Sequence, residues 1–211
     1  MSYRLVILDV DSTLIQDEVI ELLAEEAGAR TEVAAITKRS MRGEIDFEES
    51  LRERVLKLRG LPESVFGRVL DRIRISDGAR ALIGAVHASG GRVGAVSGGF
   101  TQILEPLAAQ LNLDYSAANE LEVKDGLLTG SLVGPIIDRA AKAQKLIAWA
   151  KDFGISTELV AAIGDGANDL DMFESAGLSF AYNAKPIVRE RADVVIDVPD
   201  LSLVIPHLGL K

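Results

Sequence analysis

Short apolar runs that alternate with amphipathic stretches are the feature that most restricts the fold of this 211-residue chain. Residues 4–10 form an apolar, β-branched run closed by acidic and turn-forming residues, which is typical of a strand buried on both faces. Comparable runs recur at 93–96, 159–163, 178–181 and 193–196. Helical periodicity separates most of them, over 77–89, 100–111, 139–152, 168–176 and 200–208. The pattern predicts an α/β fold in which helices cover both faces of a parallel sheet.

Residues 17–75 interrupt this alternation, because helical patterns follow one another there with no strand between them. We therefore expect a helical insertion over 15–75, after the first strand, and a core built from 1–14 and 76–211. A second, smaller interruption lies near 117–132, where Lys124-Asp125-Gly126 is a strong signal for a β-hairpin.

The composition excludes several classes of function. Lys and Arg number 23 against 32 Asp and Glu, and the net charge of -9 disfavours nucleic acid and anionic membranes as partners. There is no cysteine, so thiol chemistry is excluded. His87 and His207 are the only histidines, which are too few for a His-rich metal site. Any metal is expected to be a hard cation held by carboxylate oxygens. No apolar stretch reaches the length of about 20 residues that a membrane helix needs, and no signal-peptide core is present, so we expect a cytoplasmic protein.

Acidic residues follow the first predicted strand. Asp9 and Asp11 stand two positions apart at its end, a spacing that aims alternate strand side chains at one place. Open α/β sheets bind ligands beyond the carboxyl ends of their strands. The same residues also suit a plain strand followed by an Asp or Ser helix cap.

Two further turns carry chemistry. Ser97-Gly98-Gly99 lies between a predicted strand and a predicted helix, where a hydroxyl and glycine N–H groups suit a phosphate, although a plain strand-to-helix turn is the better explanation of this segment taken alone. Gly164-Asp165-Gly166-Ala167-Asn168-Asp169 offers two more carboxylates after a buried strand, or else ordinary turn and cap chemistry. Because all three turns are predicted at carboxyl ends of parallel strands, we expect them to converge. Carboxylates, a hard cation and a phosphate-binding turn are together the groups that phosphoryl transfer to an aspartate needs, so they predict this reaction.

At these residues the sequence resembles the haloacid dehalogenase (HAD) superfamily of phosphotransferases. Its four signatures appear in order as Asp9-Val-Asp-Ser-Thr, Ser97-Gly-Gly, Lys142 and Gly164-Asp-Gly-Ala-Asn-Asp. Without the resemblance, Lys142 reads as part of a solvated helix face. Within the superfamily the sequence looks like the phosphoserine phosphatases, because Glu18, Met41, Phe47 and Arg54 stand at matching places in the helical insertion. The resemblance implies a Rossmann-like, HAD-like core with a helical cap domain for substrate specificity at 15–75 and a small β-hairpin insertion.

The resemblance also implies a role for each residue. Asp9 attacks phosphorus and becomes an aspartyl-phosphate, and Asp11 is the general acid and base. The Asp9 carboxylate, the Asp11 backbone carbonyl and Asp165 hold Mg2+. The remaining site residues bind phosphate or support the site, and they are Ser97, Gly98, Lys142, Asn168 and Asp169.

Specificity is expected to come from the cap. Arg54 offers a forked donor to the substrate carboxylate, and Glu18 an anion to its ammonium group. Each also stands among other charged residues on a predicted helix, where a solvated face is the simpler explanation. Met41 and Phe47 are expected to shield the site from water, and apolar cap core is their simpler role.

These residues predict a magnesium-dependent phosphatase that hydrolyses O-phospho-L-serine to L-serine and phosphate, the last step of serine biosynthesis. A phosphoserine:homoserine phosphotransferase, a phosphatase for another small phosphate ester, and a signalling module with a long-lived Asp9 phosphate are the alternatives. The sequence leaves open whether the protein is a monomer or a homodimer. Because the chain begins at the catalytic strand, we expect no control by the amino-terminal regulatory domain that some members carry.

Overall fold

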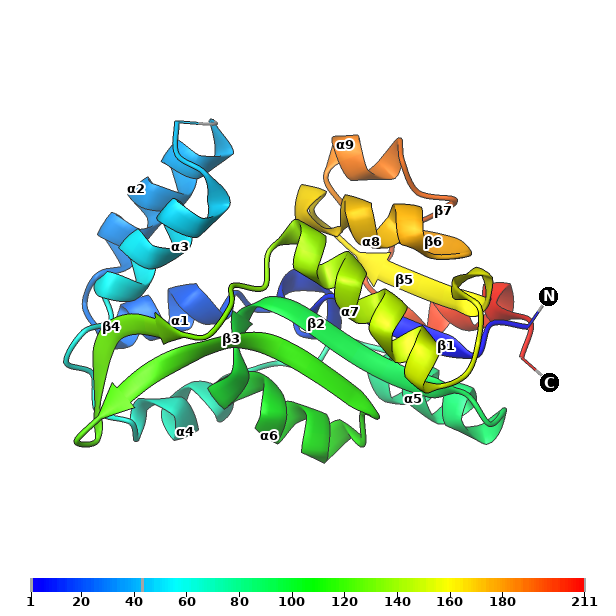
Figure 1. Cartoon of the computed structure of the whole chain (residues 1–211), viewed down its shortest axis with the longest axis horizontal. Helices are drawn as coiled ribbons and strands as arrows, with labels where there is room; N and C mark the ends of the chain where they lie inside the picture. The colour runs from blue at the N-terminus through cyan, green and yellow to red at the C-terminus, as the bar shows by residue number, and fades with distance from the viewer. Residues whose placement is uncertain (1, 43, 211) are drawn as a thin grey trace.

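The computed structural model describes residues 2–42 and 44–210. Within these residues one seven-stranded sheet has the order β4-β3-β2-β1-β5-β6-β7 (Figure 1). Its strands are β1 Leu5–Leu8, β2 Arg92–Phe100, β3 Tyr115–Lys124, β4 Leu127–Val133, β5 Val160–Gly164, β6 Leu178–Tyr182 and β7 Val194–Ile196. All neighbouring pairs are parallel except β3 and β4. The predicted parallel α/β fold is confirmed.

β1 occupies the centre of the sheet, and its sequence explains why. Its four apolar residues are fully buried, with Leu5 and Ile7 in one hydrophobic cluster and Val6 and Leu8 in the other. Each buried aliphatic side chain contributes about 1.5–3 kcal/mol to stability. A strand that is apolar at every position is stable only between two layers of helices.

Helices form those two layers. α7 (Arg139–Asp152) and α8 (Leu170–Ser175) supply the cluster on the Leu5 face, whereas α5 (Ala79–Ala88) and α6 (Thr101–Leu111) pack on the Val6 face. A short helix, α9, covers Pro186–Arg189. The helix predicted at 200–208 forms at Leu201–Leu208, where it is a 3-10 helix.

The segment 17–75 is helical in the structure. It contains α1 (Val19–Glu26), α2 (Arg30–Met41), α3 (Phe47–Leu56) and α4 (Val65–Leu70). Its two connections to the sheet lie side by side, since Gln16 N–H donates to Arg74 O at 2.9 Å and Ser76 N–H donates to Leu14 O at 3.0 Å. The α2–α3 pair projects away from the sheet (Figure 1).

The predicted hairpin forms, with Asp125 and Gly126 at positive φ in its turn. It is not a separate insertion beside the sheet, because β3 also pairs in parallel with β2 and so extends the main sheet. The hairpin tip touches the helical segment, where Gly60 N–H donates to Leu128 O at 2.8 Å and Leu128 N–H donates to Leu61 O at 2.8 Å. The sequence signal identified the turn but not the partners of its strands.

The two ends of the chain meet at the end of the sheet opposite the α2–α3 pair (Figure 1). Tyr3 N–H donates to Leu208 O at 2.9 Å, which ties them together. In the part of the chain that is described, no helix has the length and apolar character needed to cross a membrane.

Candidate active site

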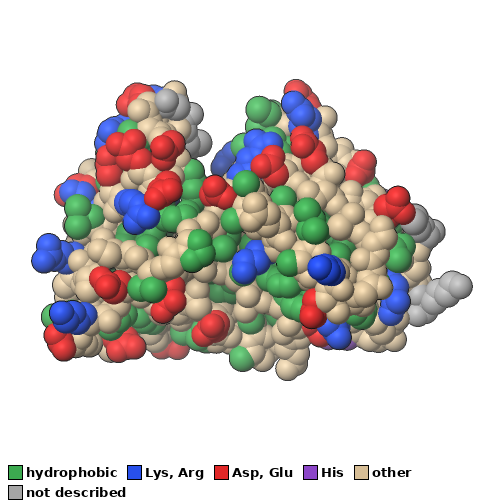
Figure 2. Space-filling view, viewed as in Figure 1, with side chains coloured by type: hydrophobic (Ala, Val, Ile, Leu, Met, Phe, Trp, Pro, Cys, Tyr) green, Lys and Arg blue, Asp and Glu red, His purple; other side chains and the backbone are tan. Residues whose placement is uncertain are grey.

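A cleft of about 510 Å³ opens where the α2–α3 pair faces the sheet. The notch between these two parts is visible in Figure 2. The three predicted turns meet in this cleft because β1, β2 and β5 are adjacent parallel strands that end at the same edge. Predicted site residues that line it are Asp9, Asp11, Glu18, Phe47, Arg54, Ser97, Gly98, Asp165 and Asn168.

Asp9 and Asp11 lie in one wide turn rather than on the strand. β1 ends at Leu8, and Leu14 N–H and Ile15 N–H reach back to the carbonyls of Asp9 and Val10 at 3.3 and 3.0 Å. Ser12, at φ 57, allows the turn to close. Both carboxylates do reach the cleft, but strand alternation is not the reason. Burial, followed by Glu18 and Asp9, raises the pKa of Asp11 well above its ordinary value.

The buried side chain of Lys142 contacts Asp9. Its Nζ donates to Asp9 Oδ1 at 2.6 Å and to Asp169 Oδ1 at 2.8 Å, and the side chain is 1% exposed. Burial opposes the charge, but Asp169 and Asp9 hold the pKa of Lys142 above its usual range. Asp9 Oδ1 also accepts the Val10 N–H at 2.7 Å. Oδ1 therefore accepts two hydrogen bonds, whereas Asp9 Oδ2 accepts none from the described residues.

The turn after β5 supplies the remaining carboxylates. Asp9, Asp165 and Asp169 each bring an oxygen within 4.8 Å of the others. Burial, with Asp9 and Asp169 as neighbours, raises the pKa of Asp165 to about 7, and burial with Asp9 raises that of Asp169 to about 6. Three crowded carboxylates with one lysine leave surplus negative charge, which a divalent cation would neutralise. The donor set thus fits a hard cation.

Ser97-Gly98-Gly99 lies inside β2 and not after it, which corrects the prediction of a strand-to-helix turn. The pairing of β2 with β3 shifts register between Val96 and Phe100, so the strand bends here. Ser97 Oγ accepts the Gly99 N–H at 2.7 Å. A Cβ at Gly99 would lie 2.9 Å from Ser97 Oγ and 3.2 Å from Asp11 Oδ2, so a larger residue there would displace these two side chains.

The residues predicted for specificity come from the helical segment. Arg54 is half-buried on α3, donates from Nε to Ser50 O at 3.2 Å, and has no ion pair within the described residues. Burial lowers its pKa, against the opposing effect of Glu18 and Asp11. Glu18 accepts the Ser12 hydroxyl at 2.7 Å. Met41 ends α2, and its side chain lies outside the described part of the chain.

Two residues near the cleft were not singled out from the sequence. Lys185 lines it, and its backbone N–H donates to Asp165 O at 3.2 Å. Its place just after β6 is a signal that could have identified it, since carboxyl ends of strands supply ligands. Asn119 is a buried side chain within β3, and its Nδ2 donates to Gly98 O at 2.8 Å. No sequence pattern marks a polar residue that is buried by a distant segment.

The site can now be compared with known proteins. The family model for haloacid dehalogenase-like hydrolases matches residues 6–174. Phosphoserine phosphatase SerB2 of Mycobacterium tuberculosis is 52% identical over 98% of this chain, which spans 51% of that protein. The phosphoserine phosphatase of Streptococcus thermophilus is 50% identical over 97% of this chain and 95% of its own length.

A solved structure described as a phospho-aspartyl intermediate analogue of phosphoserine phosphatase has a TM-score of 0.92 and 42% identity, covering 99% of this chain and all of that one. The chain thus spans about half the length of the M. tuberculosis relative and nearly all of the other two. The family match covers most of the chain, including the Asp9, Ser97, Lys142 and Asp165 segments. This chain belongs to the haloacid dehalogenase-like hydrolase family.

Proposed function

We propose that this protein is a phosphoserine phosphatase, which hydrolyses O-phospho-L-serine to L-serine and phosphate as the last step of serine biosynthesis. The observation that carries the proposal is the composition of one cleft. Asp9 lies at its base, with one oxygen free and the other bound to Lys142, while Arg54 and Glu18 line the same cleft. The similarity to phosphoserine phosphatases over nearly the whole chain supports the choice of substrate.

Asp9 is the proposed nucleophile. Its Oδ2 attacks phosphorus, a P–O bond forms, and the bond from phosphorus to the serine oxygen breaks, which leaves an aspartyl-phosphate. Lys142, held by Asp9 and Asp169, stabilises the charge on the transferred group without having to reorganise. Water then attacks phosphorus and regenerates the Asp9 carboxylate.

Asp11 is the proposed general acid and base. Its Oδ1 accepts the Val19 N–H at 3.3 Å, which orients the carboxyl group toward the cleft. It gives a proton to the departing serine oxygen in the first half and takes one from water in the second. Ser97, Gly98 and Asn168 are the proposed ligands of the phosphoryl oxygens, since all three line the cleft.

Mg2+ is the proposed cation, held by the carboxylates of Asp9 and Asp165 and the backbone carbonyl of Asp11. When bound, it supplies positive charge beside the phosphoryl oxygens. The clustered oxygens of Asp9, Asp165 and Asp169 support this assignment. Both oxygens of Asp169 accept hydrogen bonds, Oδ1 from Lys142 and Oδ2 from the Gly166 N–H at 3.2 Å, whereas Asp9 accepts them on Oδ1 alone, and this difference favours a supporting role for Asp169.

The segment 15–75 is the proposed cap domain for substrate specificity. Arg54 offers its planar fork to the α-carboxylate of phosphoserine, and Glu18 faces the ammonium group. Phe47 lines the cleft from α3, and a Cβ on Gly98 would lie 3.1 Å from its ring. Its proposed role is to shield the Ser97-Gly98 segment from water.

Phosphate release from a panel of phosphate esters tests the proposal. With Mg2+ present, kcat/KM for O-phospho-L-serine should exceed that for sugar phosphates and nucleotides, and Asp9→Asn should form no aspartyl-phosphate. Equal rates across the panel would overturn the substrate, and full turnover by Asp9→Asn would overturn the nucleophile. Transfer of phosphate to added homoserine in place of water would show a phosphotransferase instead.

A further inference from the structure

Asn119 is a buried polar side chain that the proposed chemistry does not use. It is 2% exposed and lies in β3, opposite Phe100 and beside the register shift in β2. Its Nδ2 donates to Gly98 O at 2.8 Å, and its Oδ1 accepts the Ile137 N–H at 2.7 Å. One amide group thus joins the Ser97-Gly98-Gly99 segment to the chain that enters α7.

The Asn119 contact restrains the Gly98–Gly99 peptide unit, whose flanking φ and ψ angles are less restricted than those of other residues. Glycines at both Gly98 and Gly99 remove the Cβ atoms that limit backbone rotation elsewhere. In a trans peptide the carbonyl and the following N–H point in opposite directions. Asn119 holds the Gly98 carbonyl, and the Gly99 N–H on the other side meets Ser97 Oγ at 2.7 Å. Rotation of this peptide would put a carbonyl oxygen where the Gly99 donor now lies.

The surroundings leave the peptide little alternative space once it is aligned. Gly98 lies against the Phe47 ring and Gly99 against Asp11 Oδ2. A carbonyl turned toward Ser97 would also approach the cleft that Asp9 and Asp11 line, where negative charge is already in excess. Ser97 Oγ would then meet an acceptor in place of the Gly99 donor, which would draw the hydroxyl hydrogen of Ser97 away from a phosphoryl group.

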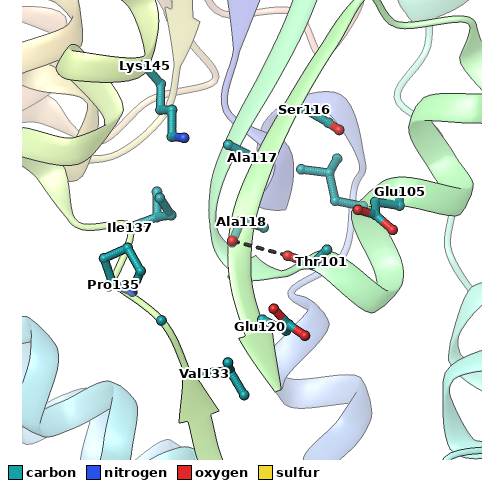
Figure 3. Close-up of a pocket in the computed structure, with 12 residues that line it drawn as sticks. Thr101, Glu105, Ser116, Ala117, Ala118, Glu120, Val133, Pro135, Ile137 and Lys145 are labelled. Carbon is teal, nitrogen blue, oxygen red and sulfur yellow. Dashed lines mark hydrogen bonds between the residues drawn. The ribbon is translucent and has the colours of Figure 1, made fainter. Parts of the chain in front are cut away.

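The backbone at Asn119 is fixed by a contact with Thr101. The Thr101 hydroxyl lies 3.1 Å from Ala118 O and 3.1 Å from Asn119 O, and Figure 3 draws the first of these contacts. Ala118, Glu120 and Ile137 line a second pocket of about 300 Å³ (Figure 3). Asn119 therefore stands between the lining of that pocket and Gly98 at the active-site cleft. Its orientation is determined by protein contacts and not by a ligand.

We propose that Asn119 is a positioning residue, which fixes the orientation of the Gly98–Gly99 peptide so that the Gly99 N–H stays bonded to Ser97 Oγ and holds this proposed phosphoryl ligand in place. The proposal rests on the proposed function for the identity of the ligand, although the peptide orientation can be measured without turnover. Asn119 touches neither the reacting atoms nor the carboxylate cluster in this arrangement.

Asn119→Leu, which is similar in size and has no donor, tests the role. Isothermal titration with orthophosphate in the presence of Mg2+ should show binding weakened about tenfold to a hundredfold, the range expected when a buried hydrogen-bonding group loses its partner. Hydrogen exchange at the Gly99 amide should accelerate by a similar factor. If the protein does hydrolyse phosphoserine, kcat/KM should fall in parallel.

Gln102→Leu is the matched control. Gln102 also makes two hydrogen bonds to β3, donating to Leu121 O at 2.7 Å and accepting the Leu121 N–H at 3.2 Å, but it does not reach Gly98. This variant should lose similar thermal stability while it keeps orthophosphate affinity and Gly99 exchange at wild-type values. Asn119→Ser, a smaller change, replaces Asn119→Leu if the latter does not fold.

Folded Asn119 variants that keep orthophosphate affinity and Gly99 exchange within twofold of wild type would overturn the proposal. A failure of the proposed function gives a different result, in which the wild type releases no phosphate from phosphoserine while the exchange and orthophosphate effects of Asn119→Leu persist.

Discussion

The ammonium nitrogen of Lys142 lies 2.6 Å from Asp9 Oδ1, with the lysine side chain 1% exposed and the aspartate side chain 6% exposed. A second buried carboxylate, Asp169, lies 2.8 Å from the same nitrogen. This buried cation lies between two anions and leaves Asp9 Oδ2, the proposed nucleophile, without a hydrogen bond from the described residues. We therefore expect Lys142 to affect both stability and activity, and we expect mutation to separate the two effects.

Lys142→Met should damage both properties. Removing the ammonium group leaves two buried carboxylates without their cationic partner, which costs about 3–5 kcal/mol of stability. Turnover should fall about 100-fold to 1000-fold, as when a preorganised charge-stabilising group is lost. Chemical denaturation and phosphate release measure the two effects. Adding Asp169→Asn should restore part of the stability and none of the activity, and activity recovered by the double variant would contradict the role of Lys142.

Mg2+ should stabilise the folded protein through the carboxylate cluster. A cation at 100 times its dissociation constant adds about 2.7 kcal/mol to the free energy of unfolding. Asp165→Asn should abolish the rise in Tm with added MgCl2, because it removes a proposed ligand. Asp171→Asn is the control, since Asp171 pairs with Arg139 at 2.6 Å outside the cluster and should keep the full rise. An unchanged rise in Asp165→Asn would place the cation elsewhere.

Arg54→Ala should change selectivity more than chemistry. We expect kcat/KM for O-phospho-L-serine to fall about 100-fold, because a half-buried charged contact to the substrate carboxylate is lost. An ester without that carboxylate, such as p-nitrophenyl phosphate, should be affected less than threefold. Arg52→Ala is the control, because Arg52 is exposed and bonds to Glu48 at 2.7 Å. Equal losses for both esters would exclude the proposed carboxylate contact.

Gly164→Ala should destabilise the protein and disturb Asp169. A Cβ at Gly164 would lie 2.3 Å from Asp169 Oδ2, so the carboxylate that holds Lys142 must move. Overpacking of this kind costs about 1–3 kcal/mol. At Gly84, in α5, a Cβ meets nothing within 4 Å, and Gly84→Ala should stabilise the helix by about 0.5–1 kcal/mol. Thermal denaturation of the two variants should therefore shift in opposite directions.

The Asp17–Arg74 pair should make stability depend on pH at acidic values. Partial burial acts in the opposite sense, but hydrogen bonds from Arg74 lower the pKa of Asp17. A lowered folded-state pKa gives stability that is fully present above the unfolded value of about 3.9 and is lost as pH falls through the folded value.

Asp17→Asn should therefore reduce the free energy of unfolding by about 1 kcal/mol at pH 7, as expected for an ion pair whose arginine is exposed. The difference should shrink below pH 4, which urea denaturation across pH can follow. Glu63→Gln is the control, since Glu63 is exposed and has no ion pair within residues 2–42 and 44–210. A difference for Asp17→Asn that stays constant down to pH 2 would contradict the assignment.

The positions of the turns could be predicted from the sequence because strand burial is local information. Leu5–Leu8 is apolar at every position, so it had to be an interior strand, and the acidic turn after Leu8 had to lie at a sheet edge. The hairpin turn at Asp125-Gly126 could also be predicted, because its signal lies in the turn residues themselves. The pairing of β3 with β2 could not be predicted, because no short sequence pattern encodes the register between two distant segments.

The sequence pattern also does not show which of two lysines on α7 is buried at the active site. Lys142 and Lys145 both stand on α7, and the sequence pattern makes each a solvated residue. In the structure Lys142 is 1% exposed and reaches Asp9, whereas Lys145 is half-buried and lines the second pocket. The rotation of α7 against the sheet decides between them.

By itself, the sequence determined which segments are strands and which turns face the functional edge, because these depend on the local spacing of apolar and polar residues. Only the tertiary structure decided that Asp9 Oδ1 is occupied, that Ser97-Gly98-Gly99 lies within a bent strand, and that Asn119 holds the Gly98 carbonyl. Each of these contacts joins residues that are distant in sequence or depends on register. The physical reason is that a hydrogen bond requires positions accurate to a fraction of an ångström, and these arise only when separate elements pack together.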